Sequence, residues 1–101
     1  MNFTLTVRRE AQIDIDEIFV WYEEQKIGLG FEFLQEFEKV INKILSNPYF
    51  ASCILHDMRA ATPKRFPYNV VYRIDELNKE IRIIAVSHQS RRPGWFKKRF
   101  K

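Results

Sequence analysis

Cysteine and long apolar runs are scarce in this chain, and each scarcity excludes a class of protein. Cys53 is the only cysteine among 101 residues, which excludes an internal disulfide and fits a reducing compartment. We expect its side chain to be small, hydrophobic and partly buried. No apolar run approaches the roughly 20 residues that span a bilayer, and no charged-then-apolar signal segment opens the chain. The sequence therefore predicts a cytoplasmic protein with no membrane association.

Motifs that hold metals or phosphates are missing as well. Two histidines and one cysteine do not make a recognisable zinc set. The three glycines (Gly28, Gly30 and Gly94) do not cluster ahead of a helix, which rules out a phosphate-binding loop. We expect neither a metal nor any other cofactor.

Apolar residues, by contrast, are abundant enough for one well-packed core. They make up 46% of the chain and include nine phenylalanines. A chain of this length buries roughly two thirds of its unfolded surface, which suffices for a single core. We therefore expect one domain over residues 1–101.

Charge is distributed unevenly along the chain. Residues 1–50 hold five Lys/Arg and nine Asp/Glu, whereas residues 51–101 hold twelve and four, so the halves carry −4 and +8. No acidic residue occurs from residue 81 onward. This asymmetry indicates that the C-terminal half binds an anionic partner, either nucleic acid or an acidic protein.

The first half of the chain reads as a strand followed by two helices. Residues 2–8 alternate apolar and polar side chains, which predicts a strand. Residues 9–25 and about 30–45 have helical periodicity, and two nearby glycines separate them, so the helices should form an antiparallel hairpin. Three apolar residues of the first helix fall outside its main stripe and predict a second apolar contact, with the next helix: Ile13, Val20 and Trp21.

The second half reads as β structure. Residues 68–75 and 80–88 form two β-rich runs joined by a short polar link, so they should pair as an antiparallel hairpin. Residues 58–62 are a weaker strand candidate, and residues 49–57 are a connection without clear period. Simple alternation assigns one face of the hairpin to the core: Val70, Tyr72, Ile74, Ile81, Ile83 and Ala85. The opposite face then carries Asn69, Val71, Arg73, Arg82, Ile84, Val86 and His88.

Together these elements predict an α+β fold of order β-α-α-β-β-β, in which a helical hairpin packs on one face of a small, mainly antiparallel sheet. The other face should stay open. Its apolar strip lies between arginines and suits an acidic amphipathic segment that folds on docking. The residues of this strip are Val71, Ile84 and Val86, with Arg73, Arg82 and Arg91 beside them.

From about residue 91 the chain continues as a basic, aromatic tail. Cations interleaved with aromatic rings suit phosphate binding with base stacking, and they equally suit docking on an acidic protein segment. A solvated tail whose Trp95 caps the core is the third possibility. The candidate binding residues in this tail are Arg91, Arg92, Trp95, Lys97 and Lys98.

Several short motifs follow one another along the chain: Ala11-x-x-Asp14-Ile15-x-x-Ile18, Gly28-Leu29-Gly30-x-x-Phe33-Leu34, Pro48, Arg59, Phe66-Pro67-Tyr68-x-Val70-x-Tyr72-Arg73-Ile74 and Ala85-Val86-x-His88. Their order resembles the RelE/ParE toxin superfamily, often labelled plasmid stabilisation proteins, and the resemblance covers nearly the whole chain. Within this set, Phe66-Pro67-Tyr68 and the histidine after the last strand, His88, are similar to the ParE-like branch.

The resemblance implies the toxin half of a type II toxin-antitoxin pair. A cognate antitoxin, which we expect to be acidic, would neutralise it, and the two could form a hetero-oligomer. ParE-like members poison DNA gyrase. RelE-like members cut mRNA on the ribosome with basic residues on the open sheet face and an aromatic residue near the C-terminus.

This chain departs from the nuclease pattern. Asn69 and Gln89 stand where RelE-like toxins carry arginines, and Trp95 stands where a tyrosine is usual. The loss of these cations weakens the case for a nuclease, because cleavage of a phosphate ester requires positive charge close to the developing anion. The resemblance therefore favours a gyrase inhibitor.

Two alternatives remain open. If the protein is a ribosome-dependent mRNA endonuclease, His88 is the best proton-transfer candidate, because its unperturbed pKa lies near 6.5. The cations left to serve that reaction are Arg73, Arg82, Arg91 and Arg92. Alternatively, the protein is a non-toxic relative that only binds its antitoxin.

Overall fold

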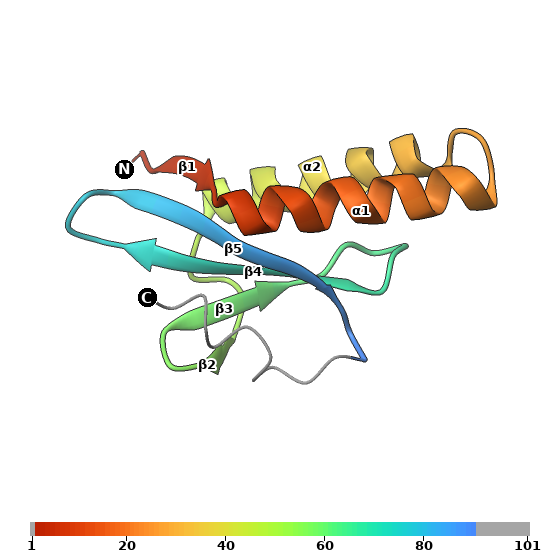
Figure 1. The fold of residues 1–101 in the computed structure, drawn as a ribbon. Helices are drawn as coiled ribbons and strands as arrows, with labels where there is room; N and C mark the ends of the chain where they lie inside the picture. Colours follow the sequence, from red (N-terminus) through yellow and green to blue (C-terminus); the bar gives the residue numbers. More distant parts are fainter. Residues whose placement is uncertain (1, 91–101) are drawn as a thin grey trace.

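A computed structural model describes residues 2–90 of the chain as two layers, with both helices on one face of a five-stranded sheet (Figure 1). The strand order is β1-β5-β4-β3-β2, with β1 parallel to β5 and all other neighbours antiparallel. This arrangement confirms the predicted α+β fold. The elements are β1 (Thr4–Val7), α1 (Arg9–Gln25), α2 (Leu29–Ser46), β2 (Cys53–Leu55), β3 (Met58–Ala61), β4 (Tyr68–Asp75) and β5 (Glu80–His88).

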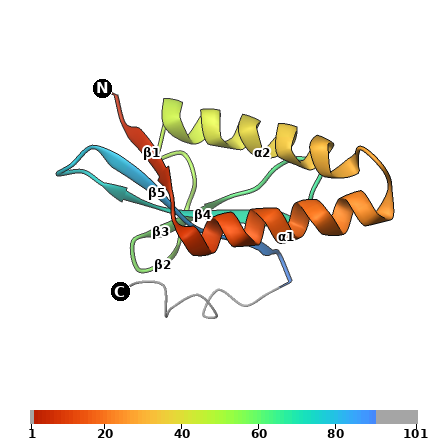
Figure 2. The same cartoon turned by 45° about the horizontal axis from the view of Figure 1, so that its top comes forward.

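The two helices form the expected hairpin and lie side by side (Figure 2). Helix α1 has the predicted bounds, and its buried side chains are Ala11, Ile15 and Ile18, at the spacing of one helical face. The chain reverses at Gly28, whose φ of 93° is accessible to glycine at little cost. The Glu23 carboxylate then accepts hydrogen bonds from the backbone N–H groups of Gly28 (2.9 Å) and Gly30 (2.8 Å). The last turns of α1 thus cap the first turn of α2.

An aromatic cluster centred on Phe33 fills the space between the helices and the sheet. The Phe33 ring is fully buried, and its centroid lies 5.6–6.2 Å from those of four neighbouring rings: Tyr22, Phe37, Phe66 and Tyr68. Burial raises the pKa of Tyr22 to about 12, and the neighbouring Tyr68 adds to this shift. The Tyr22 phenol is therefore neutral at physiological pH.

The loop after α2 is fixed to the sheet by Tyr72 and Arg59. The buried Tyr72 hydroxyl donates a hydrogen bond of 2.6 Å to the carbonyl of Pro48, and burial raises the pKa of this phenol. Arg59 donates to the carbonyl of Ala51, and its guanidinium lies over the Tyr49 ring.

We expect Tyr72→Phe to lower the free energy of unfolding by about 1–2 kcal/mol, because the Pro48 carbonyl loses its donor inside the protein. Tyr49→Phe is the matched control, since the Tyr49 side chain is 46% exposed, and we expect it to change stability by less than about 0.5 kcal/mol. Urea denaturation of both variants measures the difference. Equal stabilities would show that the Tyr72 hydroxyl contributes nothing.

A β-bulge in β5 changes which side chains face the helices. Val71 pairs with Ala85 and Tyr72 with Ile83, so the β4–β5 register passes over Ile84. Beyond this extra residue the alternation of faces is inverted. Val86 therefore packs in the helix-side core, while Ala85 joins a second cluster with Met58, Val71 and Ile84. The predicted faces of Ala85 and Val86 are wrong for this reason.

Strand β1 covers only the first part of β5. Its four residues pair with Glu80 to Ile83, and the pairing ends there. Further along β5, the Asp14 carboxylate of α1 accepts a hydrogen bond of 3.0 Å from the backbone N–H of Val86. The Asp14 side chain thus satisfies a backbone N–H group of β5 that β1 is too short to pair.

Two further expectations differ from the structure. The connection predicted for residues 49–57 contains strand β2, which pairs with β3 at the edge of the sheet. Cys53 in this strand is exposed rather than partly buried, because it lies at the edge of the sheet, where only Leu55 of the three strand residues is partly covered.

Candidate functional site

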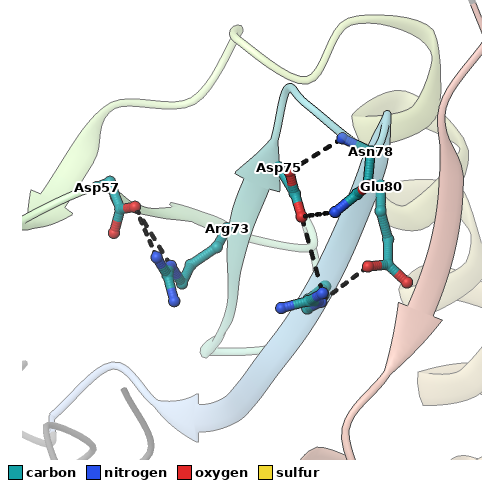
Figure 3. Close-up of polar contacts among 6 residues, drawn as sticks. Asp57, Arg73, Asp75, Asn78 and Glu80 are labelled. Carbon is teal, nitrogen blue, oxygen red and sulfur yellow. Dashed lines mark hydrogen bonds and ion pairs between the residues drawn. The ribbon is translucent and has the colours of Figure 1, made fainter. Parts of the chain in front are cut away.

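Arg73 of β4, shown beside Asp57 in Figure 3, lies opposite Arg82 of β5. The alternation of side chains places both arginines on the sheet face that turns away from the helices, as predicted. Both are ion-paired. Two guanidinium nitrogens of Arg73, Nη2 and Nε, lie 3.0 and 3.3 Å from Oδ2 of Asp57. Arg82 Nε donates to Glu80 Oε1 at 2.8 Å, and its Nη2 lies 3.7 Å from Oδ2 of Asp75. These carboxylates offset the repulsion between two like charges placed opposite each other on neighbouring strands.

A hollow of about 310 Å³ lies beside the two arginines, lined by Arg73, Ile74, Asp75, Glu76 and Arg82. Its carboxylate Asp75 accepts hydrogen bonds from the side chain of Asn78 (2.9 Å) and from the Asn78 backbone N–H (3.1 Å). These bonds, with a smaller contribution from Arg82, hold the pKa of Asp75 below its usual value. The hollow therefore presents carboxylate and guanidinium groups together.

His88 lies apart from these arginines, contrary to the prediction that it shares their face. Its ring packs edge-on against Tyr68, with centroids 5.3 Å apart. Its Nδ1 accepts a hydrogen bond of 3.0 Å from the Ser90 backbone N–H. Because the bulge at Ile84 inverts the alternation, His88 turns towards the helix side of the sheet, where it lines a hollow with Glu17 and Trp21 of α1.

The predicted antitoxin-binding strip is not an exposed surface. Val71 and Ile84 do lie on the face away from the helices, but their side chains are 0% and 1% exposed. Val86 is 3% exposed and belongs to the helix-side core. The expected exposed apolar strip is therefore wrong, and the binding of an antitoxin by these residues stays a prediction.

The predicted binding residues of the C-terminal tail lie outside the described residues: Arg91, Arg92, Trp95, Lys97 and Lys98. Residues 91–101 hold six of the seventeen Lys/Arg and no acid. Residues 1–90 accordingly carry eleven Lys/Arg and thirteen Asp/Glu, a formal charge of −2. The excess positive charge of the protein thus belongs to its last eleven residues.

The outer side of α1 carries a second candidate surface, which the sequence analysis missed. Ile13, Val20 and Trp21 are 47%, 51% and 52% exposed, so their expected contact with the next helix is wrong. The helices meet instead through Gly30, which lies against Phe19. The signal was present in the sequence, because these three apolar residues fall outside the buried stripe of α1.

Within residues 2–90, no group of three or more His, Cys, Asp or Glu side chains is placed to hold a metal ion. In the same part of the chain, no helix combines the length and the apolar character needed to cross a membrane.

A family model described as "ParE toxin of type II toxin-antitoxin system, parDE" matches residues 5–93. A sequence search of curated proteins finds no match.

Solved structures with the same fold include both ParE and RelE toxins. A chain of the chromosomal ParDE system from P. aeruginosa is 19% identical at a TM-score of 0.74, over 85% of this chain and 95% of that one. A chain of the intact E. coli RelBE toxin-antitoxin complex is 15% identical at a TM-score of 0.69, over 88% and 99%. The isolated E. coli RelE toxin is 14% identical at a TM-score of 0.66, over 95% and 94%. At these identities the likeness establishes the fold.

Proposed function

Because the chain belongs to the ParE toxin family of type II toxin-antitoxin systems, we propose that it inhibits DNA gyrase and that a cognate acidic antitoxin neutralises it. Its place of action would be the cytoplasm.

The observation that carries this proposal is the separation of His88 from Arg73 and Arg82. Cleavage of RNA requires a proton-transfer group and cations that converge on one phosphate. Here the bulge at Ile84 turns the histidine towards α1, and both arginines on the other side of the sheet are already paired with carboxylates. A toxin that acts by binding a protein target needs no such convergence, which favours gyrase over the ribosome.

The exposed ion pairs also support an acidic antitoxin as partner. Solvent-exposed pairs such as Arg73–Asp57 and Arg82–Glu80 are worth about 0–1 kcal/mol each. Carboxylates of a docking segment can therefore replace Asp57 and Glu80 at little cost. Toxin-antitoxin complexes are among the structures with this fold, and we expect this chain to form a hetero-oligomer of the same kind.

One observation favours a second candidate, a ribosome-dependent mRNA endonuclease. Residues 91–101 carry six Lys/Arg and three aromatic residues without any acid, a composition that suits RNA. In that reading these cations would supply the charge that the paired arginines do not, and His88 would transfer the proton.

Supercoiling by purified gyrase separates the two candidates. We expect the wild-type protein, in excess over gyrase, to suppress supercoiling and to leave ribosome-bound mRNA intact. His88→Ala should suppress supercoiling equally, because the gyrase-directed proposal gives this histidine no role.

Unimpaired supercoiling at excess protein would contradict the proposal. If mRNA were cleaved by the wild type and spared by His88→Ala, the endonuclease reading would replace it. If neither activity appeared and expression without the antitoxin left growth unimpaired, the chain would be a non-toxic relative that only binds its antitoxin.

A further inference from the structure

We propose that the outer face of α1 is a docking surface for a basic segment of a partner protein, which presents Lys or Arg side chains beside an aliphatic or aromatic one. We call this surface the α1 face and define it by Ile13, Asp16, Glu17, Val20, Trp21 and Glu24.

The α1 face is a continuous stripe with an apolar centre. Its residues recur at helical spacing and therefore lie one above the other along the helix. Three of them are large apolar side chains that are about half exposed: Ile13, Val20 and Trp21. Monomeric proteins seldom expose apolar groups contiguously, and such patches with a polar rim mark interaction sites.

Two hollows border Trp21. One hollow of about 340 Å³ is lined by Asp16, Glu17, Val20, Trp21 and Glu24. A second, of about 260 Å³, shares Glu17 and Trp21 and extends across Asp14 and Ile18 to the end of β5 at Val86, Ser87 and His88. Both hollows are open and shallow, and a docking side chain in either of them would contact Glu17 and the Trp21 ring.

The charge of the α1 face specifies a basic partner. Helix α1 contains six acidic residues and one basic residue, Arg9. Four carboxylates line the two hollows, from Asp14, Asp16, Glu17 and Glu24, and among residues 2–90 no Lys or Arg lines either hollow. The negative end of the helix dipole lies near Glu24 and adds to this field.

A Lys or Arg side chain can contact the α1 face through both its charged head and its aliphatic stem. Its charged head can approach Glu17 and the Trp21 ring, where ion pairing and cation–π attraction act together. Its aliphatic stem can cover Val20. An acidic antitoxin segment would be repelled here, so the α1 face and the cationic C-terminal half are suited to partners of opposite charge.

The inference holds whichever target the toxin has, because the α1 face is distinct from Arg73 and Arg82 on the other side of the sheet. It is tested with a synthetic amphipathic peptide in which Lys and Leu recur at helical spacing, and with a second peptide that carries Glu in place of Lys. Calorimetric titration at low and at physiological salt gives the dissociation constants.

We expect the Lys peptide to bind saturably and the Glu peptide not to bind. Trp21→Ala should raise the dissociation constant about fivefold by removing the ring, and Glu17→Lys should raise it roughly tenfold by reversing a charge. Leu77→Ala and Glu38→Lys are the matched controls, because both residues are exposed away from the α1 face, and neither should change the constant.

Four results would overturn the proposal. Absence of saturable binding would do so, as would equal weakening by the control substitutions. A homodimer that Trp21→Ala dissociates would assign the surface to a second copy of the chain. A shift of the Trp21 indole resonance on replacing Lys97 and Lys98 by glutamate, without peptide, would assign it to the chain's own basic segment.

Discussion

Phe33→Ala should lower the free energy of unfolding by about 3–5 kcal/mol, the range found when a large aromatic side chain is removed from a core. The Phe33 ring is 0% exposed and contacts aromatic rings from both helices and from the sheet side, so its loss leaves a cavity that no single element can close. A domain of this size is stable by only about 5–15 kcal/mol. The variant should therefore unfold at much lower urea concentration.

Phe31→Ala provides the control for this substitution. Phe31 lies in the same helix and is 59% exposed, with an edge-on contact to Phe19. We expect it to cost less than about 1 kcal/mol, close to the value of a single exposed aromatic contact. Similar losses from both variants would show that the aromatic cluster is not the main core.

Gly30→Ala should destabilise the protein by about 2 kcal/mol, the cost of forcing extra atoms into a packed contact. A Cβ atom at Gly30 would lie 2.7 Å from the backbone oxygen of Phe19 and 2.8 Å from Cγ of Glu23. Helix propensity alone gives the opposite sign, because alanine is better than glycine inside a helix by about 1 kcal/mol. The direction of the change therefore decides between close helix packing and propensity.

Thermal and urea unfolding of Gly30→Ala can be compared with Gln35→Ala. Gln35 is exposed in the same helix, so its replacement should shift stability by no more than about 0.5 kcal/mol. If Gly30→Ala proved more stable than the wild type, the close approach of α1 and α2 at this residue would be refuted.

The helices and the central hairpin were predictable because local periodicity determines them. Helix α1 spans Arg9 to Gln25 as predicted, since its buried stripe and the glycines that follow it are all visible in sequence. The β4–β5 pairing follows from two β-rich runs with a short link. In each case the information lies within about twenty consecutive residues.

The bulge and strand β2 could not be predicted in the same way. Residues 83–86 are all apolar, so no polar residue marks where the alternation slips by one at Ile84. Strand β2 has three residues, too few to show a period. The slip moves Val86 and His88 to the other side of the sheet, which changes the candidate site more than it changes the fold.

The ion pairs of Arg73 and Arg82 also could not be predicted from the sequence. Alternation along the strands predicts that Arg73 and Arg82 lie on the face away from the helices, as they do, but it does not reveal that Arg73 pairs with Asp57 of the β2–β3 turn, sixteen residues earlier. Such a pairing arises from the tertiary arrangement of strands. A count of charges along the chain therefore overstates how positive this face is.

The carboxylate of Asp14 at the Val86 N–H has a consequence for how the protein behaves in concentrated solution. Beyond the end of β1, the margin of β5 would otherwise offer its backbone to a strand from a neighbouring molecule, the first step towards an intermolecular sheet. An incoming strand meets an occupied donor and a negative charge at this point. Asp14 therefore disfavours intermolecular strand pairing, and with it aggregation, along the part of the β5 edge that β1 does not cover.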